Sequence, residues 1–144
     1  MLSLNDALLG ETISQLRGCG RRRNECVVYW TGALAEQGVV DAALHPSHSA
    51  GPDFYEVTQR WLHETSLALA RGKRTIRAQV HTHSGRAFHS RSDDSFPIVA
   101  QPGFLSLVLP HHAVRDDLAG AYLAQLGADG RWRDIPIEQG LVIG

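Results

Sequence analysis

Two histidines, His81 and His83, flank a single threonine at the end of an apolar segment, and this spacing could serve a metal ion. On a β-strand, residues i and i+2 project from the same face, so both imidazoles could bind one ion. Asp93 and Asp94 follow closely and could add a carboxylate oxygen. Two histidines and one carboxylate leave a fourth tetrahedral position for water, which is typical of a catalytic zinc site, where the pKa of the water falls to about 7.

A site of this kind needs a general base to take the proton of the water. Glu25 directly precedes the apolar run 26–31, which has the β-branched and aromatic composition of a buried strand. Burial at the start of such a strand disfavours the charged form of a carboxylate and can raise its pKa toward that of a base at neutral pH. We therefore predict Glu25 as the general base.

In this order the residues resemble the JAB/MPN/JAMM metalloprotease domain. The pattern of that family is a glutamate at an early strand, then His-x-His far downstream, a serine, and an aspartate three residues after the serine. Here these positions are Glu25, His81 and His83, Ser90 and Asp93. The resemblance implies that His81, His83 and Asp93 bind zinc, that Glu25 activates the water, and that Ser90 stabilises the tetrahedral intermediate.

The sequence departs from the family pattern in two places. Ser84 stands where the family usually has proline, and Ser90 lies seven rather than eight residues beyond the second histidine. If the family distance were kept, Asp94 would be the ligand, but the position three residues before it is Arg91. The interpretation preferred here is therefore Ser90 with Asp93, and the choice between Asp93 and Asp94 stays open.

Five further histidines are expected to be ordinary loop residues. His89 lies inside the motif, where a solvated side chain is a simpler interpretation than a contact with substrate. The others on the loops are His45, His48, His111 and His112, which lie beside Pro46 and Pro110.

The apolar periodicity predicts the elements that position these residues. Helices are predicted over residues 4–17 and 54–71, the second with Asp53 and Glu56 at capping-box spacing. The predicted strands cover residues 26–31, 39–44, 75–81, 104–109 and 141–143, with a hairpin of 121–126 and 132–137, and residues 45–52 are predicted as a loop. This is a mixed α/β domain, and the resemblance implies a single JAB/MPN-type domain over residues 1–144, with a curved mixed β-sheet flanked by helices.

The composition excludes several other classes of protein. The chain has 144 residues, 43% of them hydrophobic and 20% charged, with a formal net charge of −1. These values favour one globular domain and argue against disorder and against nucleic-acid or membrane binding. Cys19 and Cys26 do not form a CxxC pair, so neither a disulfide scaffold nor a cysteine-based zinc site is predicted, and a reducing cytoplasm is the expected location.

The function implied by the resemblance is that of a zinc-dependent isopeptidase or peptidase that cleaves after the C-terminal tail of a ubiquitin-like protein. By analogy with small bacterial members of the family, the partner would be a ubiquitin-like protein or its conjugates, in some cases within a system that acts against phage. Two alternatives stay open: a non-catalytic scaffold of the same fold, and a metal hydrolase of a small peptide or amino-acid conjugate.

Overall fold

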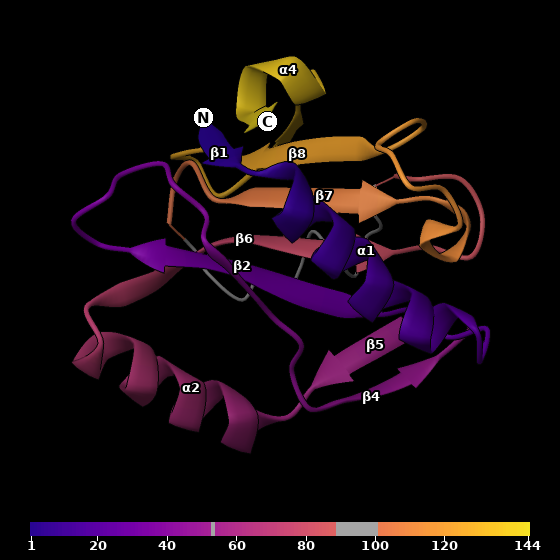
Figure 1. Ribbon diagram of the computed structural model, residues 1–144, viewed down its shortest axis with the longest axis horizontal. Helices are drawn as coiled ribbons and strands as arrows, with labels where there is room; N and C mark the ends of the chain where they lie inside the picture. The colour runs from indigo at the N-terminus through magenta and orange to yellow at the C-terminus, as the bar shows by residue number, and fades with distance from the viewer. Residues whose placement is uncertain (53, 89–100) are drawn as a thin grey trace.

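The computed structural model describes residues 1–52, 54–88 and 101–144, and these residues build a six-stranded mixed sheet with the order β3-β2-β6-β7-β8-β9. Its strands are β2 (Val27–Ala33), β3 (Ala42–Leu44), β6 (Arg74–Thr82), β7 (Leu105–Leu109), β8 (Tyr122–Leu126) and β9 (Trp132–Asp134). Neighbouring strands are antiparallel except for β6 and β7, which are parallel. The predicted mixed sheet is confirmed (Figure 1).

Helix α1 (Asp6–Gly20) crosses one face of the sheet, in front of the central strands in Figure 1. The Asn5 side chain caps its first turn by accepting a hydrogen bond of 2.8 Å from the Leu8 backbone N–H. Its buried residues are Leu8, Thr12, Ile13 and Leu16. They join the core with Val28 and Trp30 of β2 and Val80 of β6, which confirms the predicted helix.

The two ends of the chain meet beside β8, close to the short helix α4 (Ile137–Gly140). Strand β1 (Leu2–Leu4) precedes α1 and pairs in parallel with β10 (Leu141–Ile143). The prediction that the first helix starts at about Leu4 is thus wrong by two residues. A 3-10 helix, η1 (His111–Ala113), follows β7 and contacts α1.

The prediction of one helix over residues 54–71 is wrong in its first part. Strand β5 (Phe54–Val57) pairs with β4 (His48–Gly51), and the predicted loop 45–52 is therefore also wrong where β4 lies. Helix α2 (Gln59–Arg71) begins only after Thr58, whose hydroxyl accepts a hydrogen bond of 3.3 Å from the Trp61 N–H. Glu56 lies in β5 rather than in a capping box, and Asp53 falls outside the described residues.

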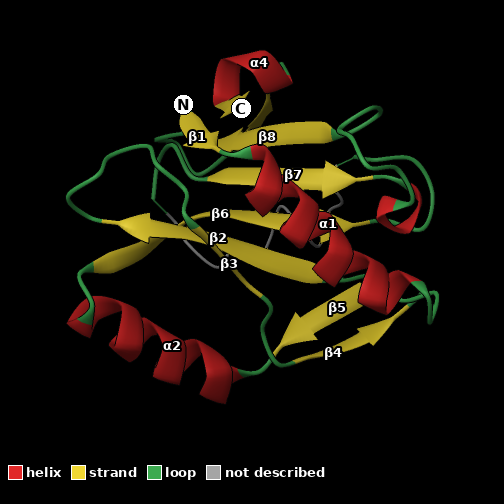
Figure 2. Cartoon of the chain, viewed as in Figure 1, coloured by secondary structure: helices red, strands yellow, loops and turns green. Residues whose placement is uncertain are grey.

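The other predicted strands agree with the structure to within a few residues. The hairpin of β8 and β9 is present, and the strand predicted over residues 39–44 is reduced to β3 because Val39 instead bridges Ser3. Figure 2 shows α2 and the β4–β5 hairpin beyond the β2 side of the sheet, away from the termini. None of the helices in the described part of the chain has the length and apolar character of a membrane span.

Candidate metal centre

The two histidines of the predicted motif lie at the carboxyl end of β6, in the middle of the sheet. His81 belongs to the strand and is fully buried, and His83 follows it with 6% of its surface exposed. Their ring centroids are 5.3 Å apart. The main chain stays fixed beyond the strand, because the His83 N–H donates to the Leu109 carbonyl at 3.0 Å and its carbonyl accepts from the His112 N–H at 2.9 Å.

The start of β2 runs alongside this strand end. Val27 pairs with His81 in the antiparallel ladder. One step further out, the Thr82 N–H donates to the Cys26 carbonyl at 3.0 Å, and the Cys26 N–H donates to the Thr82 hydroxyl at 3.0 Å. The ladder therefore continues past the last paired strand residue, and the next residue of the β2 chain comes level with His83.

That next residue is Glu25, which is 9% exposed. Its backbone N–H donates to the Gly51 carbonyl of β4 at 2.8 Å, so the segment before β2 is held on a second side. Side chains opposite each other in an antiparallel ladder share a face, and alternate residues return to that face. Glu25 is thereby placed on the face that carries His81 and His83.

Aromatic side chains surround the two imidazoles. Tyr55 of β5 has its ring centroid 5.5 Å from that of His81. Phe88 meets the His83 ring edge-on at 4.6 Å, while 43% of its own surface remains exposed. The Arg86 guanidinium lies 5.5 Å from the centre of the Phe88 ring. The histidine pair therefore has an enclosed side at β5 and a side that reaches solvent at Phe88.

The donor set of this face fits a transition-metal ion such as zinc. Imidazole nitrogens are ligands that zinc accepts readily, and a nearby carboxylate can serve as base rather than ligand. Asp93, its alternative Asp94, Ser90 and His89 lie outside the described residues, so the third ligand and the serine stay predictions.

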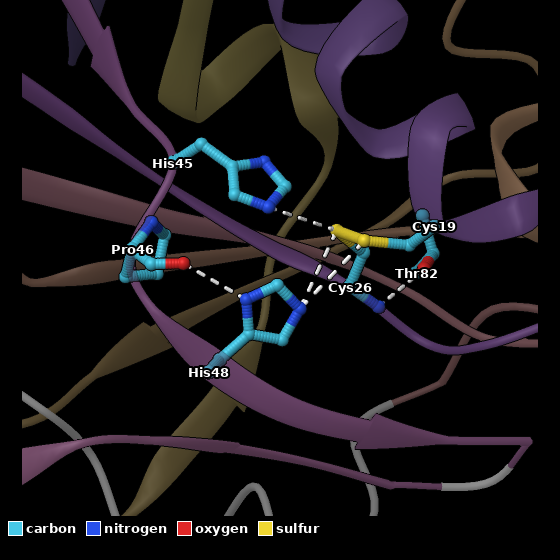
Figure 3. Close-up of a disulfide and its surroundings, with 6 residues drawn as sticks. All are labelled: Cys19, Cys26, His45, Pro46, His48 and Thr82. Carbon is cyan, nitrogen blue, oxygen red and sulfur yellow. Dashed lines mark hydrogen bonds between the residues drawn. A yellow bond between two sulfur atoms is a disulfide. The ribbon is translucent and has the colours of Figure 1, made fainter.

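A second group of metal-binding residue types lies on the other side of the β2 start. Cys19 and Cys26 form a disulfide, with their Cα atoms 5.7 Å apart, although the sequence did not predict a disulfide scaffold (Figure 3). The imidazoles of His45 and His48 face the two sulfurs, whereas the sequence predicted ordinary loop histidines. The burial of His45 and the nearby His48 lower the pKa of His45.

This second group borders a surface pocket of about 420 Å³, lined by Cys19, His45 and His48 together with Gln15, Gly18, Arg22 and Asn24. The sequence did carry a signal for it. Two cysteines and two closely spaced histidines lie within thirty positions of one another, in segments to which the zinc-protease motif assigned no role. The spacing of these residues did not indicate that the segment between β3 and β4 packs against the end of α1.

Comparison with known proteins agrees with this fold. A solution structure of a protein from Desulfitobacterium hafniense superposes with a TM-score of 0.69 at 14% identity and covers 100% of this chain and 93% of that one. A JAB1/MPN domain protein from Archaeoglobus fulgidus superposes with a TM-score of 0.58 at 10% identity, covering 99% of this chain and 97% of that one. At such identities the likeness shows the fold alone, which is that of a JAB/MPN domain.

The family is shown by sequence. The chain is 32% identical over 131 residues to the probable metalloprotease y4jG of Sinorhizobium fredii, a match that covers 85% of this chain and 80% of that protein. No family model matches the chain. The protein belongs to the same family as this probable metalloprotease and has a JAB/MPN metalloprotease-like domain. The family is one of metal-dependent peptidases, which implies a bound metal ion.

Proposed function

We propose that the protein is a zinc-dependent isopeptidase or peptidase that hydrolyses the amide bond after the C-terminal tail of a ubiquitin-like protein. The observation that carries this proposal is that the register of β2 and β6 puts a buried glutamate, Glu25, on the same face as two buried histidines, His81 and His83. Membership in a family of metal-dependent peptidases supports the same chemistry.

The proposed roles follow from the chemistry of amide hydrolysis. Zinc held by His81, His83 and Asp93 would supply a Lewis acid that polarises the amide carbonyl and lowers the pKa of water. Glu25 would accept a proton from the attacking water and pass it to the nitrogen of the leaving amine as the C–N bond breaks. Ser90 would donate a hydrogen bond to the carbonyl oxygen as negative charge develops on it.

The substrate part of the proposal concerns an extended peptide tail. A tail of this kind would lie beside a strand end near His83, where main-chain hydrogen bonds supply affinity and narrow pockets favour small residues such as glycine. Partly exposed Phe88, in edge contact with His83, offers an apolar surface at the solvent side. The corresponding cellular role would be deconjugation or precursor processing, including in bacterial conjugation systems that act against phage.

The first test replaces the proposed base. Glu25→Gln keeps the shape of the side chain but cannot accept the proton, so we expect turnover to fall by about 10²–10⁴-fold with metal content unchanged. The substrates are a panel of ubiquitin-like proteins fused through their C-termini to a reporter, with products identified by mass spectrometry. Glu56→Gln, an exposed glutamate in β5, is the matched control and should cleave at the wild-type rate.

The same preparations also test the ligand assignment. His83→Ala and Asp93→Ala should lose the metal of this centre, whereas Asp94→Ala should keep it, as measured by elemental mass spectrometry on protein with the Cys19–Cys26 disulfide intact. Retention of metal in Asp93→Ala and its loss in Asp94→Ala would reverse the preferred register. Wild-type turnover in Glu25→Gln would show the assigned mechanism to be wrong, and metal binding without cleavage of any fusion would favour a scaffold.

A further inference from the structure

We propose that Cys19, Cys26, His45 and His48 form a second metal site, a structural zinc site that fills when the two cysteines are reduced. These residues offer two sulfurs and two imidazole nitrogens, and all four donor atoms lie within 4.8 Å of one another. The site is separate from the histidine pair of β6, because alternation along the chain sends Cys26 to the face of the sheet opposite Glu25.

The distances between donor atoms match a zinc tetrahedron. With zinc bonds of about 2.3 Å to sulfur and about 2.0–2.1 Å to nitrogen, the sulfur-to-nitrogen edges of a tetrahedron are about 3.6 Å long. The Nε2 atom of His48 lies 3.6 Å from the Cys19 Sγ and 3.9 Å from the Cys26 Sγ, and the His45 Nε2 lies 3.8 Å from the Cys26 Sγ. The main change that zinc requires is that the two sulfurs separate to about 3.8 Å, while every other donor distance is already within 4.8 Å.

A hydrogen bond orients His48 as a ligand. Its Nδ1 atom lies 2.9 Å from the carbonyl oxygen of Pro46, which can only accept, so Nδ1 carries the proton. In the neutral ring the lone pair is then on Nε2, the atom that faces the sulfurs (Figure 3). Histidine ligands of zinc commonly have their second nitrogen fixed by such a bond to a backbone carbonyl. This arrangement does not stabilise the disulfide, because an unprotonated Nε2 cannot donate a hydrogen bond to a sulfur atom.

Four separate segments supply the four donors. Cys19 lies in the last turn of α1, Cys26 precedes β2, His45 follows β3, and His48 begins β4. Four protein ligands complete the coordination of zinc and leave no position for water, so the site would be structural rather than catalytic. The pocket beside Cys19, His45 and His48 gives an ion a path from solvent.

Filling the site from the disulfide form requires a reductant. A thiol reductant supplies the two electrons and two protons that convert the S–S bond into two thiols, and is itself oxidised to a disulfide. Each cysteine thiol then loses its proton as its sulfur binds the metal. Disulfide and metal are thus alternative occupants of one site.

The experiment uses the reduced protein of 144 residues and cobalt(II) as a spectroscopic substitute for zinc. We expect a thiolate-to-cobalt charge-transfer band that saturates with one equivalent at this site and disappears when zinc is added. Histidine and carboxylate ligands do not give that band, so the site at His81 and His83 does not contribute to it. Cys26→Ser should reduce the band to half or less, because one of the two thiolates is lost, and His63→Ala, an exposed histidine of α2, should leave it unchanged.

Two further variants keep the proposal testable if Cys26→Ser fails to fold. His45→Asn and His48→Asn should keep both thiols yet weaken zinc binding by about 100-fold or more, since even the loss of an outer hydrogen bond to a ligand costs 10–100-fold. Zinc should also raise the unfolding temperature of the reduced protein, by an amount that grows with the logarithm of the zinc concentration above the dissociation constant. The proposal is overturned if reduced wild type gives no charge-transfer band, if both histidine variants bind as tightly as wild type, or if the disulfide resists thiol reductant. These outcomes are independent of peptidase activity.

Discussion

Trp30 shows how one residue ties the first helix to the sheet. Its side chain is fully buried, and the indole N–H donates to the Thr12 hydroxyl of α1 at 2.8 Å. The Thr12 hydroxyl in turn donates to the Leu8 carbonyl at 2.8 Å. The Thr12 hydroxyl therefore accepts one hydrogen bond and donates another, and both side chains are fully buried.

Replacing this hydroxyl should be costly although the shape of the side chain is kept. Thr12→Val leaves the buried indole N–H without an acceptor, so we expect the free energy of unfolding to fall by about 1–3 kcal/mol, as measured in urea. Thr12→Ser retains the oxygen and should lose less. A larger loss in Thr12→Ser than in Thr12→Val would mean that the methyl group, not the hydrogen bond, stabilises this contact.

The two histidines of the candidate metal centre could be predicted from the sequence because they lie close together in it. His81 and His83 are two positions apart, and the structure places His81 in β6 and His83 directly after it, with Glu25 level with them through the ladder. Their catalytic and ligand roles stay predictions, as do those of Ser90 and Asp93. The group formed by Cys19, Cys26, His45 and His48 was not predicted, because the two histidines approach the cysteines only in the folded chain.

At the scale of elements, strands that pair across long distances were the hardest to predict. Phe54 and Val57 are three positions apart, a spacing that favours a helix when the segment is considered alone. The ladder with β4 outweighs that preference, because pairing satisfies the backbone of both segments. Elements with a long apolar pattern, such as α1 and β6, were predictable because the periodicity is visible within the segment itself.

An ion pair between the start of β6 and the residue before the edge strand β3 should make a contribution to stability that depends on pH. Arg74, at the start of β6, hydrogen-bonds Asp41 before β3 and donates to the Thr31 hydroxyl of β2 at 3.2 Å. Hydrogen bonding to Arg74 holds the pKa of Asp41 below its ordinary value. A lowered folded-state pKa gives stabilisation that is present above about pH 4, the pKa in the unfolded chain, and is lost as the pH falls through the folded-state pKa.

Asp41→Asn should therefore be less stable than wild type at pH 7, and the difference should vanish in acid. The measurement is urea unfolding of both proteins between pH 7 and pH 2, with Arg74→Gln and the double variant completing the cycle. Because both side chains are partly exposed, we expect a small effect. A difference that persists unchanged below pH 2 would show that Asp41 acts through something other than its charge.

At the scale of the whole molecule, the two ends of the described chain close the fold on each other. The β1–β10 ladder pairs Leu2 with Leu141 and Leu4 with Ile143, and the Gly144 N–H donates to the Leu4 carbonyl at 3.1 Å. Leu4 and Leu141 both belong to the hydrophobic core. Stability of the first helix and of the last strand should therefore be coupled.

Two neighbouring residues of β10 give a matched test of this closure. Leu141 is 5% exposed and Val142 is 50% exposed. We expect Leu141→Ala to lower the free energy of unfolding by about 2–5 kcal/mol, because it leaves a cavity in the core. Val142→Ala should change it by less than about 1 kcal/mol. Similar values for both variants, measured by urea unfolding, would mean that β10 frays in the native protein.

The alternation of side chains at the start of β2 has a consequence for how sequences of this family can diverge. Glu25 and Val27 share the face of His81, while Cys26 between them belongs to the disulfide on the other face. An insertion or deletion of one residue within this triplet would exchange the two faces and carry the carboxylate into the helix-covered core. We therefore expect relatives to differ in length over residues 21–24 more readily than between Glu25 and Val27, where the chain is held in register with β6.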